Sequence, residues 1–410
     1  MPELFEPARL GPLTLKNRVI KAATFEGMTP GGQVSDQLIE FHSRVARGGT
    51  AMTTQAYVAV APEGRTDDGG LYLHAGVMKG LRRLTDAIHA EGALISAQVG
   101  HAGPVANARS NGVPSYAPGR FFNPLSMQRT KACTEYDIAR ITSDYERGAK
   151  MCVEAGFDCL EVHLGHNYLL SSFLSPALNR RTDRWGGSLE NRARFARQVV
   201  KAVREAVGDK VAVIAKLNME DGYKGGLKID ESLQVAKWLE DDGALDAIEL
   251  TSGSSLMNPM YLFKGAAPLK EFVTTLPWYL RPGFRLVGKS FLKAYPYEEA
   301  YFLEKATRFR EALDMPLVLL GGIAQLETAE RGLAEGFEFV AMGRALLIDP
   351  DLINKFVDGS RTKSRCIHCN RCMATIYTGT RCPLVEPKPG DRPMLPEEAI
   401  AVELAPTPAA

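Results

Sequence analysis

The sequence lacks the features that mark membrane, secreted and nucleic-acid-binding proteins. No apolar run approaches the ~18 residues that a helix needs to cross a bilayer, and the first residues, MPELFEPARL, show no charged segment followed by an apolar one. The formal net charge is +1, without a long run of like charge. This balance argues against nucleic acid or an anionic membrane as a partner. We therefore expect a cytoplasmic protein that acts on small molecules, and homo-oligomerisation stays open.

The composition that remains is that of an ordinary globular enzyme. Hydrophobic residues make up 45% and charged residues 24% of the 410 residues. This length would suit two average domains, but α/β barrels also reach it as one domain with insertions. Four of the seven cysteines cluster near the end of the chain, at Cys366, Cys369, Cys372 and Cys382. In a reducing compartment such a cluster favours metal binding over disulfides.

Short apolar runs rich in β-formers alternate with longer helical patterns along most of the chain. We expect strands at Val19–Thr24, Thr50–Val58, Ala93–Val99, Cys159–Leu164, Val211–Asn218, Ala247–Gly253, Leu317–Ile323 and Phe339–Gly343. We expect helices at Asp36–Arg47, Val77–Ala90, Glu135–Ala155, Leu189–Val207, Glu231–Asp241, Glu298–Leu313 and Leu326–Glu335. Such alternation predicts a parallel sheet, and a closed (β/α)₈ TIM barrel accounts for eight strands without leftover edges. An open doubly wound sheet is the alternative, but the first strand runs into KAATFEGM rather than a Gly-rich fingerprint.

Other segments interrupt or frame this alternation. The piece LFEPARLGPLTLKNRVI predicts an N-terminal hairpin that leads into the first strand. Insertions follow strand three (His101–Cys133) and strand six (Ser254–Tyr295), at the face where barrel enzymes build their sites. We expect residues 1–358 to form the barrel. Residues 359–410 are expected to be a Cys-containing, Pro-rich extension that wraps the surface or is partly disordered, and that is not an independent domain.

Polar residues and glycines stand at the expected strand ends. They are Thr24, Gln55, Gln98, His163, Lys216, Thr251, Gly321-Gly322 and Gly343-Arg344. The last two pairs occupy the loops after strands seven and eight, which form the usual phosphate site of such barrels. Glycine lets backbone N–H groups approach an anion, and Arg344 offers a fork of donors. The alternative is that these glycines only form tight turns.

Two further strand ends suit a ring-shaped cofactor. Lys216 would place its ammonium at the mouth of the barrel, where it could stabilise negative charge, although an ion-paired lysine would look the same in sequence. Gln98 both donates and accepts hydrogen bonds, as the edge of a planar heterocycle requires.

His163, His166 and Tyr168 follow the fourth strand and form the most specific cluster. Two imidazoles spaced i, i+3 at a strand end can converge on one oxygen and stabilise a developing oxyanion. Metal ligation is the alternative, but no third ligand is evident. Tyr168 stays protonated near neutral pH and can act as an acid. Glu161 shares the face of His163, and as a buried carboxylate it needs a cation, for which Lys21 is the expected partner.

These motifs resemble the Old Yellow Enzyme family of FMN-dependent oxidoreductases, including the barrel domain of dienoyl-CoA reductase. The matching pieces reach to about Asp351. They are FEPARLGPLTLKNRVI, PEGR, SAQVGHAG, EVHLGHNYLLSSFLSP with NRRTDRWGGSLENRARF, AKLN, LLGGI and AMGRALLIDPDL. The piece from Glu161 to Phe195 is the most specific.

The resemblance implies an FMN at the top of the barrel, with NAD(P)H as hydride donor and an activated alkene as substrate. The implied cofactor-binding residues are Ala22, Ala23, Thr24, Gln98, Lys216, Gly322, Gly343 and Arg344. It also implies that His163 and His166 bind the substrate oxygen, and that Tyr168 donates the proton while the flavin delivers the hydride. NADH or NADPH preference and the natural substrate are not readable from the motifs.

Three features depart from the family pattern. Ser171–Pro176 reads SSFLSP where relatives have NQFLSP, and Phe25 stands where some relatives have Cys or Thr. In the tail CIHCNRCMATIYTGTRC only nine residues separate Cys372 from Cys382, fewer than in relatives with an iron–sulfur cluster. The alternatives for the four cysteines are an iron–sulfur cluster, a zinc ion, or reduced thiols that close the end of the barrel. The other functional alternatives are an amine dehydrogenase or dienoyl-type reductase with a cluster, a non-flavin lyase or isomerase in which Lys216 is the nucleophile, and a non-catalytic binding protein.

Overall fold

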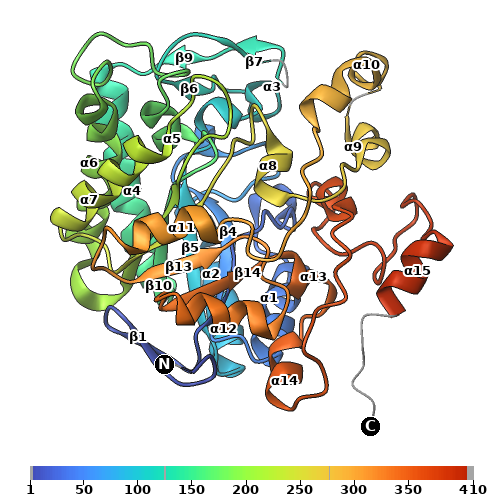
Figure 1. Cartoon of the computed structure of the whole chain (residues 1–410). Coiled ribbons are helices and arrows are strands. Elements are labelled where there is room, and N and C mark those ends of the chain that lie inside the picture. The colour runs from blue at the N-terminus through green and yellow to red at the C-terminus, as the bar shows by residue number, and fades with distance from the viewer. Residues whose placement is uncertain (1–2, 124–125, 277, 404–410) are drawn as a thin grey trace.

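Eight parallel strands close into a barrel in the computed structural model, which describes residues 3–123, 126–276 and 278–403 (Figure 1). The barrel strands are β3 (Val19–Lys21), β4 (Met52–Ala59), β5 (Leu94–Gly100), β10 (Cys159–Leu164), β11 (Ala212–Asn218), β12 (Ala247–Thr251), β13 (Leu317–Leu320) and β14 (Phe339–Met342). They pair in chain order, and β14 pairs with β3 to close the ring. The predicted TIM barrel is confirmed, and no open edge remains among these strands.

The N-terminal hairpin closes one end of the barrel. Strands β1 (Ala8–Leu10) and β2 (Leu13–Leu15) pair antiparallel, as predicted. Leu10 and Leu15 are fully buried in one apolar cluster with the first residues of several barrel strands, among them Cys159 and Phe339. The hairpin therefore covers the N-terminal end, and the opposite end is the one available for a site.

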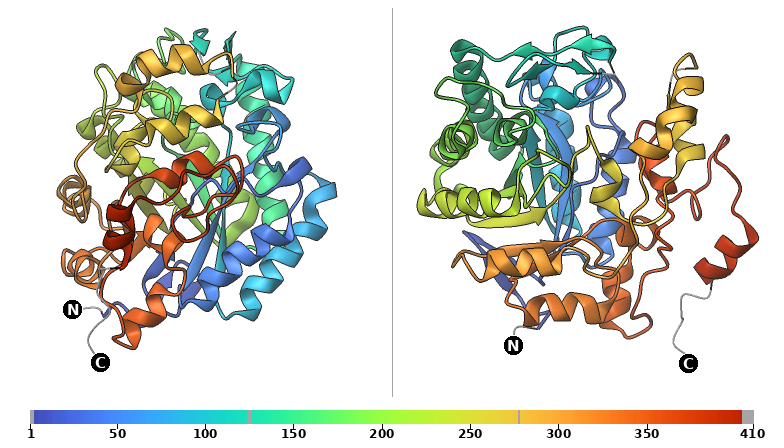
Figure 2. Two further views of the ribbon diagram at one scale, coloured as in Figure 1. Left: turned by 90° about the vertical axis from the view of Figure 1, so that its right-hand side faces the viewer. Right: turned by 45° about the horizontal axis from the view of Figure 1, so that its top comes forward.

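Helices surround the barrel on its outside (Figures 1 and 2). The helices that follow the strands are α1 (Asp36–Arg47), α2 (Met78–Ala90), α4 (Glu135–Glu154), α5 (Leu169–Leu174), α6 (Leu189–Val207), α7 (Ile229–Asp241), α11 (Leu303–Arg310), α12 (Leu326–Ala334), α13 (Arg344–Ile348) and α14 (Leu352–Val357). Helix α4 begins with a capping box between Thr134 and Asp137. Among the described residues, no helix combines the length and apolar character needed to cross a bilayer.

The strand predicted at Val19–Thr24 already ends at Lys21, and two further predicted elements are shortened by the loop after β13. The helix expected at Glu298–Leu313 begins only at Leu303, since Ala300 has a φ of 51° and its N–H donates to the Gly322 carbonyl at 2.8 Å. Strand β13 ends at Leu320 because Gly321 and Gly322 have φ values of 110° and 78°.

Both insertions fold into small elements of their own. The first carries η4 (Gly103–Val105), α3 (Ala108–Asn111) and the two-stranded pairs of β6 (Tyr116–Ala117) with β9 (Lys131–Ala132) and of β7 (Phe122–Asn123) with β8 (Gln128–Arg129). The second carries α8 (Pro259–Phe263), α9 (Leu269–Thr275) and α10 (Arg281–Phe291). The remaining short 3₁₀ turns are η1 (Pro30–Gly32), η2 (Pro62–Gly64), η3 (Ala75–Val77) and η5 (Gly208–Lys210).

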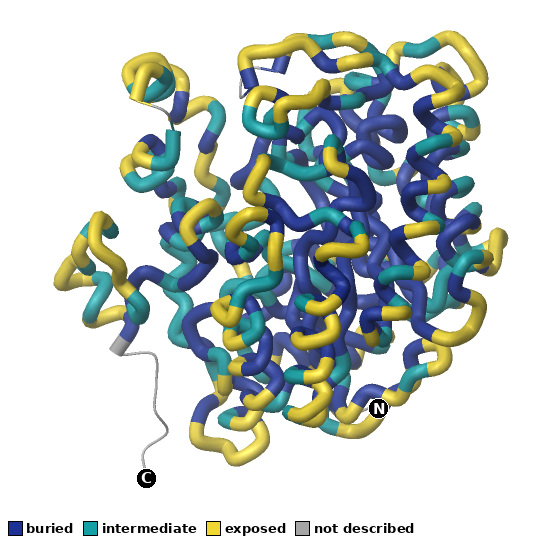
Figure 3. The backbone as a smooth tube through the Cα atoms, turned by 180° about the vertical axis from the view of Figure 1, so that it is seen from behind, coloured by how far each residue is buried: buried dark blue, intermediate teal, exposed yellow. Residues whose placement is uncertain are grey.

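The C-terminal segment returns to the open end of the barrel. It contains η6 (Arg371–Thr375) and α15 (Pro396–Glu403). The Thr380 N–H donates to the Glu26 carbonyl at 2.7 Å, and the Asn370 side chain donates to the carbonyls of Lys264 and Ala266 at 3.1 and 2.9 Å. Figure 3 shows exposed residues concentrated on such outer segments, around buried strands. The end of the predicted extension, beyond Glu403, lies outside the described residues, and the division at residue 358 stays a prediction.

Candidate functional site

The strand register places the predicted polar residues side by side at one end of the barrel. Glu161 on β10 pairs with Gln98 on β5, and His163 pairs with Lys216 on β11. Lys216 in turn pairs with Glu249 on β12. Parallel strands keep register partners on the same face. Three residues predicted separately, Gln98, His163 and Lys216, therefore belong to one site.

The rings of His163, His166 and Tyr168 lie against one another at the end of β10. The centroid of His163 is 5.1 Å from that of His166 and 4.6 Å from that of Tyr168. His163 is buried, and its Nδ1 has no hydrogen-bond partner among the described residues. A buried polar atom without a partner is costly, so this nitrogen is available to a ligand that enters the site.

The backbone after β10 turns sharply and brings the His166 ring next to that of His163. His166 and Asn167 both have positive φ values, 61° and 58°, a conformation that non-glycine residues seldom adopt. The His166 N–H donates to the Asn218 side-chain oxygen at 3.0 Å, and its Nε2 shares a 2.9 Å hydrogen bond with Thr251 Oγ1. The ends of β11 and β12 thus hold the His166 ring.

The buried carboxylate of Asp221 holds the residues around His166 in place. Asp221 accepts hydrogen bonds from the side-chain amides of Asn167 and Asn218, each at 3.1 Å, and from the Leu227 N–H at 2.8 Å. Asn167, Asn218 and Asp221 are all fully buried. Sequence reasoning missed these supporting residues. The only signal was a set of polar side chains directly after apolar strands.

Both imidazoles are neutral at physiological pH. Burial, with the nearby His166 and Lys216, lowers the pKa of His163 well below its usual value. Burial and Lys216 lower the pKa of His166 to about 3. Each ring therefore has one N–H donor and one acceptor nitrogen, and neither supplies a positive charge.

These shifts predict how rate and stability depend on pH. The rate of substrate reduction should show no inflection from either imidazole between about pH 5 and pH 8, the range in which an ordinary histidine titrates. The free energy of unfolding should fall as the pH drops from about 6.5 to about 3. In this range the histidines of the unfolded chain bind protons, whereas the buried rings of the folded protein stay neutral. Stopped-flow rates and denaturant unfolding across this range test both. An imidazole that protonates near pH 6 in the folded protein would contradict them.

Tyr168 lies among aromatic side chains. Its ring is 5.6 Å from that of Tyr57, and both pack in an apolar cluster with Ala23 and Phe25, close to the end of β3. Burial, with nearby Tyr377 and Asp67, raises the pKa of Tyr168 above its usual value. The hydroxyl therefore keeps its proton at neutral pH. Tyr57 differs because its hydroxyl donates to the Gly64 carbonyl.

Lys216 is buried between two carboxylates. Its Nζ lies 3.1 Å from Glu161 Oε1 and also donates to Glu249 Oε1. Gln98 Nε2 donates to Glu161 at 2.5 Å. Glu161 has the buried cationic partner that was expected, but the partner is Lys216 and not Lys21. Lys21 bonds instead to Thr24 Oγ1 at 2.8 Å and to Glu26 at 3.4 Å, because the neighbouring strand β11 brings Lys216 closer to Glu161.

The two predicted phosphate loops differ in what their glycines do. A side chain at Gly321 or Gly322 would collide with Phe302 or Tyr301, at 2.4 and 2.6 Å, so packing alone requires glycine there. At Gly343 the only outside atom of the described residues within 4 Å of an added Cβ is the Thr24 methyl, at 3.8 Å. Packing does not require glycine at 343, which leaves room for a ligand beside Thr24. Arg344 follows and donates to the Lys264 carbonyl at 2.9 Å and to Asn370.

Comparison with known proteins decides the family. The sequence profile of the NADH:flavin oxidoreductase / NADH oxidase family matches residues 3–256. The chain belongs to this family. The resemblance drawn from the motifs is thereby confirmed, and the protein is an oxidoreductase of an FMN-dependent, NAD(P)H-using family. The non-flavin lyase, the isomerase and the non-catalytic binding protein are set aside.

Three family relatives show how far the similarity extends. The chain is 57% identical over 381 residues to the 4,4'-dithiodibutanoate disulfide reductase of Rhodococcus erythropolis, covering 93% of this chain and 94% of that protein. It is 34% identical over 380 residues to a metal reductase of Desulforamulus reducens, covering 92% of this chain and 52% of that protein. The structure of a 2-naphthoyl-CoA reductase complex matches with a TM-score of 0.79 and 26% identity, over 93% of this chain and 56% of that one. The chain therefore spans nearly all of the first relative and about half of the other two.

The residues present fit the flavin of this family. Lys216 and the amide of Gln98 stand at the open end of the barrel, and the unpartnered Nδ1 of His163 lies beside them. The room beside Gly343 and Thr24 adjoins Ala22 and Ala23 at the end of β3. A planar ring against the end of β3 and a phosphate near Gly343 would occupy this space. Arg344 is the exception, because its guanidinium is directed to the Lys264 carbonyl and to Asn370.

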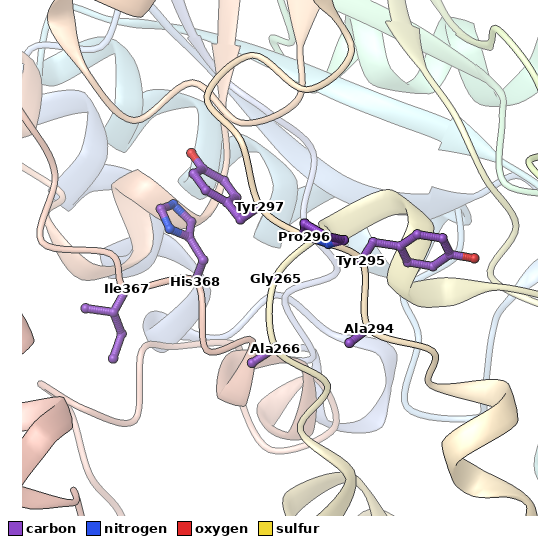
Figure 4. A pocket seen from close by; sticks show the side chains of 8 residues that line it. All are labelled: Gly265, Ala266, Ala294, Tyr295, Pro296, Tyr297, Ile367 and His368. Carbon is purple, nitrogen blue, oxygen red and sulfur yellow. The ribbon is translucent and has the colours of Figure 1, made fainter.

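A cavity of about 490 Å³ lies between the second insertion and the C-terminal segment (Figure 4). Tyr295, Tyr297 and His368 contribute its aromatic side chains, and the rings of Tyr297 and His368 stack. The Tyr297 hydroxyl donates to the Gly322 carbonyl at 3.1 Å, and the Arg344 guanidinium lies over the Tyr297 ring. The cavity therefore borders the phosphate loops rather than the His163 cluster.

The four clustered cysteines line one small cavity with Arg344 and Ile348. All four are free thiols, and burial raises the pKa of each. Among the described residues, no three potential metal-ligating side chains are arranged to hold a metal ion. The four cysteines therefore share a cavity, as an iron–sulfur cluster or zinc would require, but the described residues are not arranged to coordinate a metal ion.

Proposed function

We propose that the protein is an FMN-dependent reductase that uses NAD(P)H to reduce the C=C bond of an activated alkene, such as an α,β-unsaturated carbonyl compound. The observation that carries this proposal is the gathering of His163, His166 and Tyr168 around the end of β10. Three neutral donors in one place suit a substrate whose carbonyl oxygen must be held while its carbon is protonated.

The cofactor would be held by residues from five strand ends. Ala22–Thr24 would lie against the ring, Gln98 and Lys216 would face its polar edge, and Gly322, Gly343 and Arg344 would hold the phosphate. When bound, FMN accepts a hydride from NAD(P)H and passes it to the β-carbon of the alkene.

The chain's own residues supply the remaining chemistry. His163 and His166 donate hydrogen bonds to the carbonyl oxygen, where negative charge develops as the hydride arrives. Tyr168 donates its phenolic proton to the α-carbon. Asn218 and Thr251 keep His166 in position, and Tyr168 packs in an apolar cluster with Tyr57 and Phe25.

A two-step anaerobic experiment tests the function. Protein loaded with FMN should lose its yellow colour when NAD(P)H is added, and 2-cyclohexen-1-one should restore it with formation of the saturated ketone. Cyclohexanone, which lacks the C=C bond, is the matched control and should leave the reduced protein unchanged. A protein that does not take up FMN, or whose reduced form is not reoxidised by any activated alkene, would refute the proposal.

Reduction of an organic disulfide is a second candidate, favoured by the 57% identity to the disulfide reductase of Rhodococcus erythropolis. Here the hydride would attack one sulfur, the S–S bond would break, and Tyr168 would protonate the departing thiolate, so that one disulfide yields two thiols. Adding 4,4'-dithiodibutanoate to the reduced protein decides between the candidates. Faster reoxidation than by the enone, with release of two thiols per flavin, would favour the disulfide.

A further inference from the structure

Lys216 has more negative partners than its single charge can balance. Its Nζ contacts Glu161 on β10 at 3.1 Å and also Glu249 on β12. The three side chains are at most 3% exposed. With all three groups ionised, the cluster would have a net charge of −1 in the barrel interior, where uncompensated charge is strongly disfavoured.

The two carboxylates are not equivalent. Glu161 accepts hydrogen bonds from both Gln98 and Lys216. Glu249 accepts a hydrogen bond from Lys216 through Oε1, and its Oε2 is buried without a partner among the described residues. An ionised carboxylate oxygen needs donors in such a place, whereas a protonated one is neutral. Of the two carboxyls, Glu249 is therefore the one suited to hold a proton.

Within the part of the chain that the structure describes, Lys216 is the cation that compensates Glu249. On the far side of β12 its register partner is Val318 of β13, an apolar residue. The charges that act on Glu249 are Lys216 and Glu161. The other buried lysine, Lys21 on β3, is itself paired with Glu26 at 3.4 Å. The protonation of Glu249 is thus decided within the cluster of Glu161, Lys216 and Glu249.

Glu249 changes its protonation state near neutral pH. Burial raises the pKa of Glu249 to about 7, with Glu161 adding to the rise and Lys216 opposing it. Burial alone would lower the pKa of Lys216, but the two carboxylates outweigh it and raise that pKa. Lys216 therefore keeps its charge, while Glu249 gains or loses a proton when a charge nearby changes.

We propose that Glu249 takes up a proton when the bound flavin is reduced, which leaves Lys216 with a single carboxylate partner and allows it to balance the negative charge of the reduced flavin. This inference rests on the proposed function, since it requires FMN beside Lys216. Glu249 does not touch the reacting atoms and acts through Lys216, so it is a positioning residue. Its role would be to make flavin reduction depend on pH.

The step balances in charge and atoms. NAD(P)H is oxidised and transfers two electrons and one proton as hydride, which places one negative charge on the flavin. One proton from solvent neutralises the Glu249 carboxylate. Above the pKa of Glu249 in the oxidised protein, reduction thus consumes one proton more than the flavin alone requires. Below that pKa, Glu249 is already protonated and no extra proton is consumed.

Potentiometric titration of the FMN-loaded protein from about pH 5 to about pH 9, roughly two pH units on either side of neutrality, tests this proposal. In the wild type, the number of protons taken up per two electrons should rise by one above about pH 7. In Glu249→Gln the extra proton should be absent, and the flavin should be easier to reduce than in the wild type at high pH but not at low pH. Glu26→Gln is the control, because Glu26 is a second buried carboxyl whose pKa is raised by burial, to about 8, but it contacts Lys21 rather than Lys216. It should keep the extra proton.

A second measurement does not depend on any variant. The reduced-minus-oxidised infrared spectrum of the wild type at about pH 8, one unit above the pKa of Glu249, should gain a carboxylic acid C=O band that shifts in D₂O. Absence of this band, or an unchanged proton count in Glu249→Gln, would overturn the role of Glu249 while leaving the proposed reductase intact. A protein that takes up no FMN would instead refute the proposed function.

Discussion

Replacing Tyr168 with phenylalanine should slow alkene reduction by about 10²- to 10⁴-fold, the usual contribution of a general acid. The ring and its packing against His163 and Tyr57 would be retained, so only the phenolic proton is lost. Flavin reduction by NAD(P)H should be almost unchanged, because that step takes no proton from Tyr168. Anaerobic stopped-flow measurement of the two half-reactions separates these effects.

Tyr57→Phe provides the matched control for this substitution. Tyr57 lies in the same aromatic cluster, but its hydroxyl is bonded to the Gly64 carbonyl and is not free to protonate a substrate. Its loss should leave the rate of alkene reduction within a few-fold of the wild type. If Tyr57→Phe slowed the reaction as much as Tyr168→Phe, or if both half-reactions of Tyr168→Phe fell together, the assignment of the proton donor would be wrong.

Replacing Lys216 with methionine should lower the free energy of unfolding by about 3–5 kcal/mol, as expected when one member of a buried ionic cluster is removed. Glu161 and Glu249 would then remain buried without a cation. The loss of stability should grow with rising pH. The unfolded chain ionises both carboxyls freely, whereas the folded chain would have to bury their charge without a cation. Denaturant unfolding of the cofactor-free protein at several pH values measures it.

Two companion variants separate charge from shape at this position. Lys216→Arg keeps a buried cation and should lose much less stability than Lys216→Met. The double variant Lys216→Met/Glu249→Gln leaves one buried carboxylate in place of two and should recover part of the loss. Equal stability of Lys216→Met and the wild type would show that the ionic cluster does not stabilise the fold as the contacts indicate.

Local sequence patterns were sufficient to predict most of the elements and the location of the site. Alternation within CLEVHL placed Glu161 and His163 on one face, and the strand end placed Lys216 at the mouth of the barrel. They were not sufficient to predict ion partners. Lys21 and Lys216 are both buried lysines on barrel strands, and only the closure of the barrel shows that Lys216 is the neighbour of Glu161.

The supporting residues of the site were the least predictable. Asp221 reaches Asn167 across two loops that are 54 residues apart in the chain, and no periodicity relates positions at such a distance. Glu249 carried a detectable signal, because a carboxylate within the apolar strand AIELT must be compensated. Which cation pairs with Glu249, and which of its oxygens stays unbonded, depend on the position of Lys216. Lys216 lies on a different strand, so the sequence of β12 does not reveal it.

The alternation of strands and helices, and the side chains that stand where the strands end, followed from local sequence alone. They did so because backbone periodicity and helix-ending glycines act within a few residues. Packing between strands was needed to show that two carboxylates share Lys216, that Asn218 and Thr251 hold His166, and that the Tyr57 hydroxyl is bonded to Gly64. These relations depend on the distance between side chains of different strands, which is set when β14 meets β3 and the barrel closes.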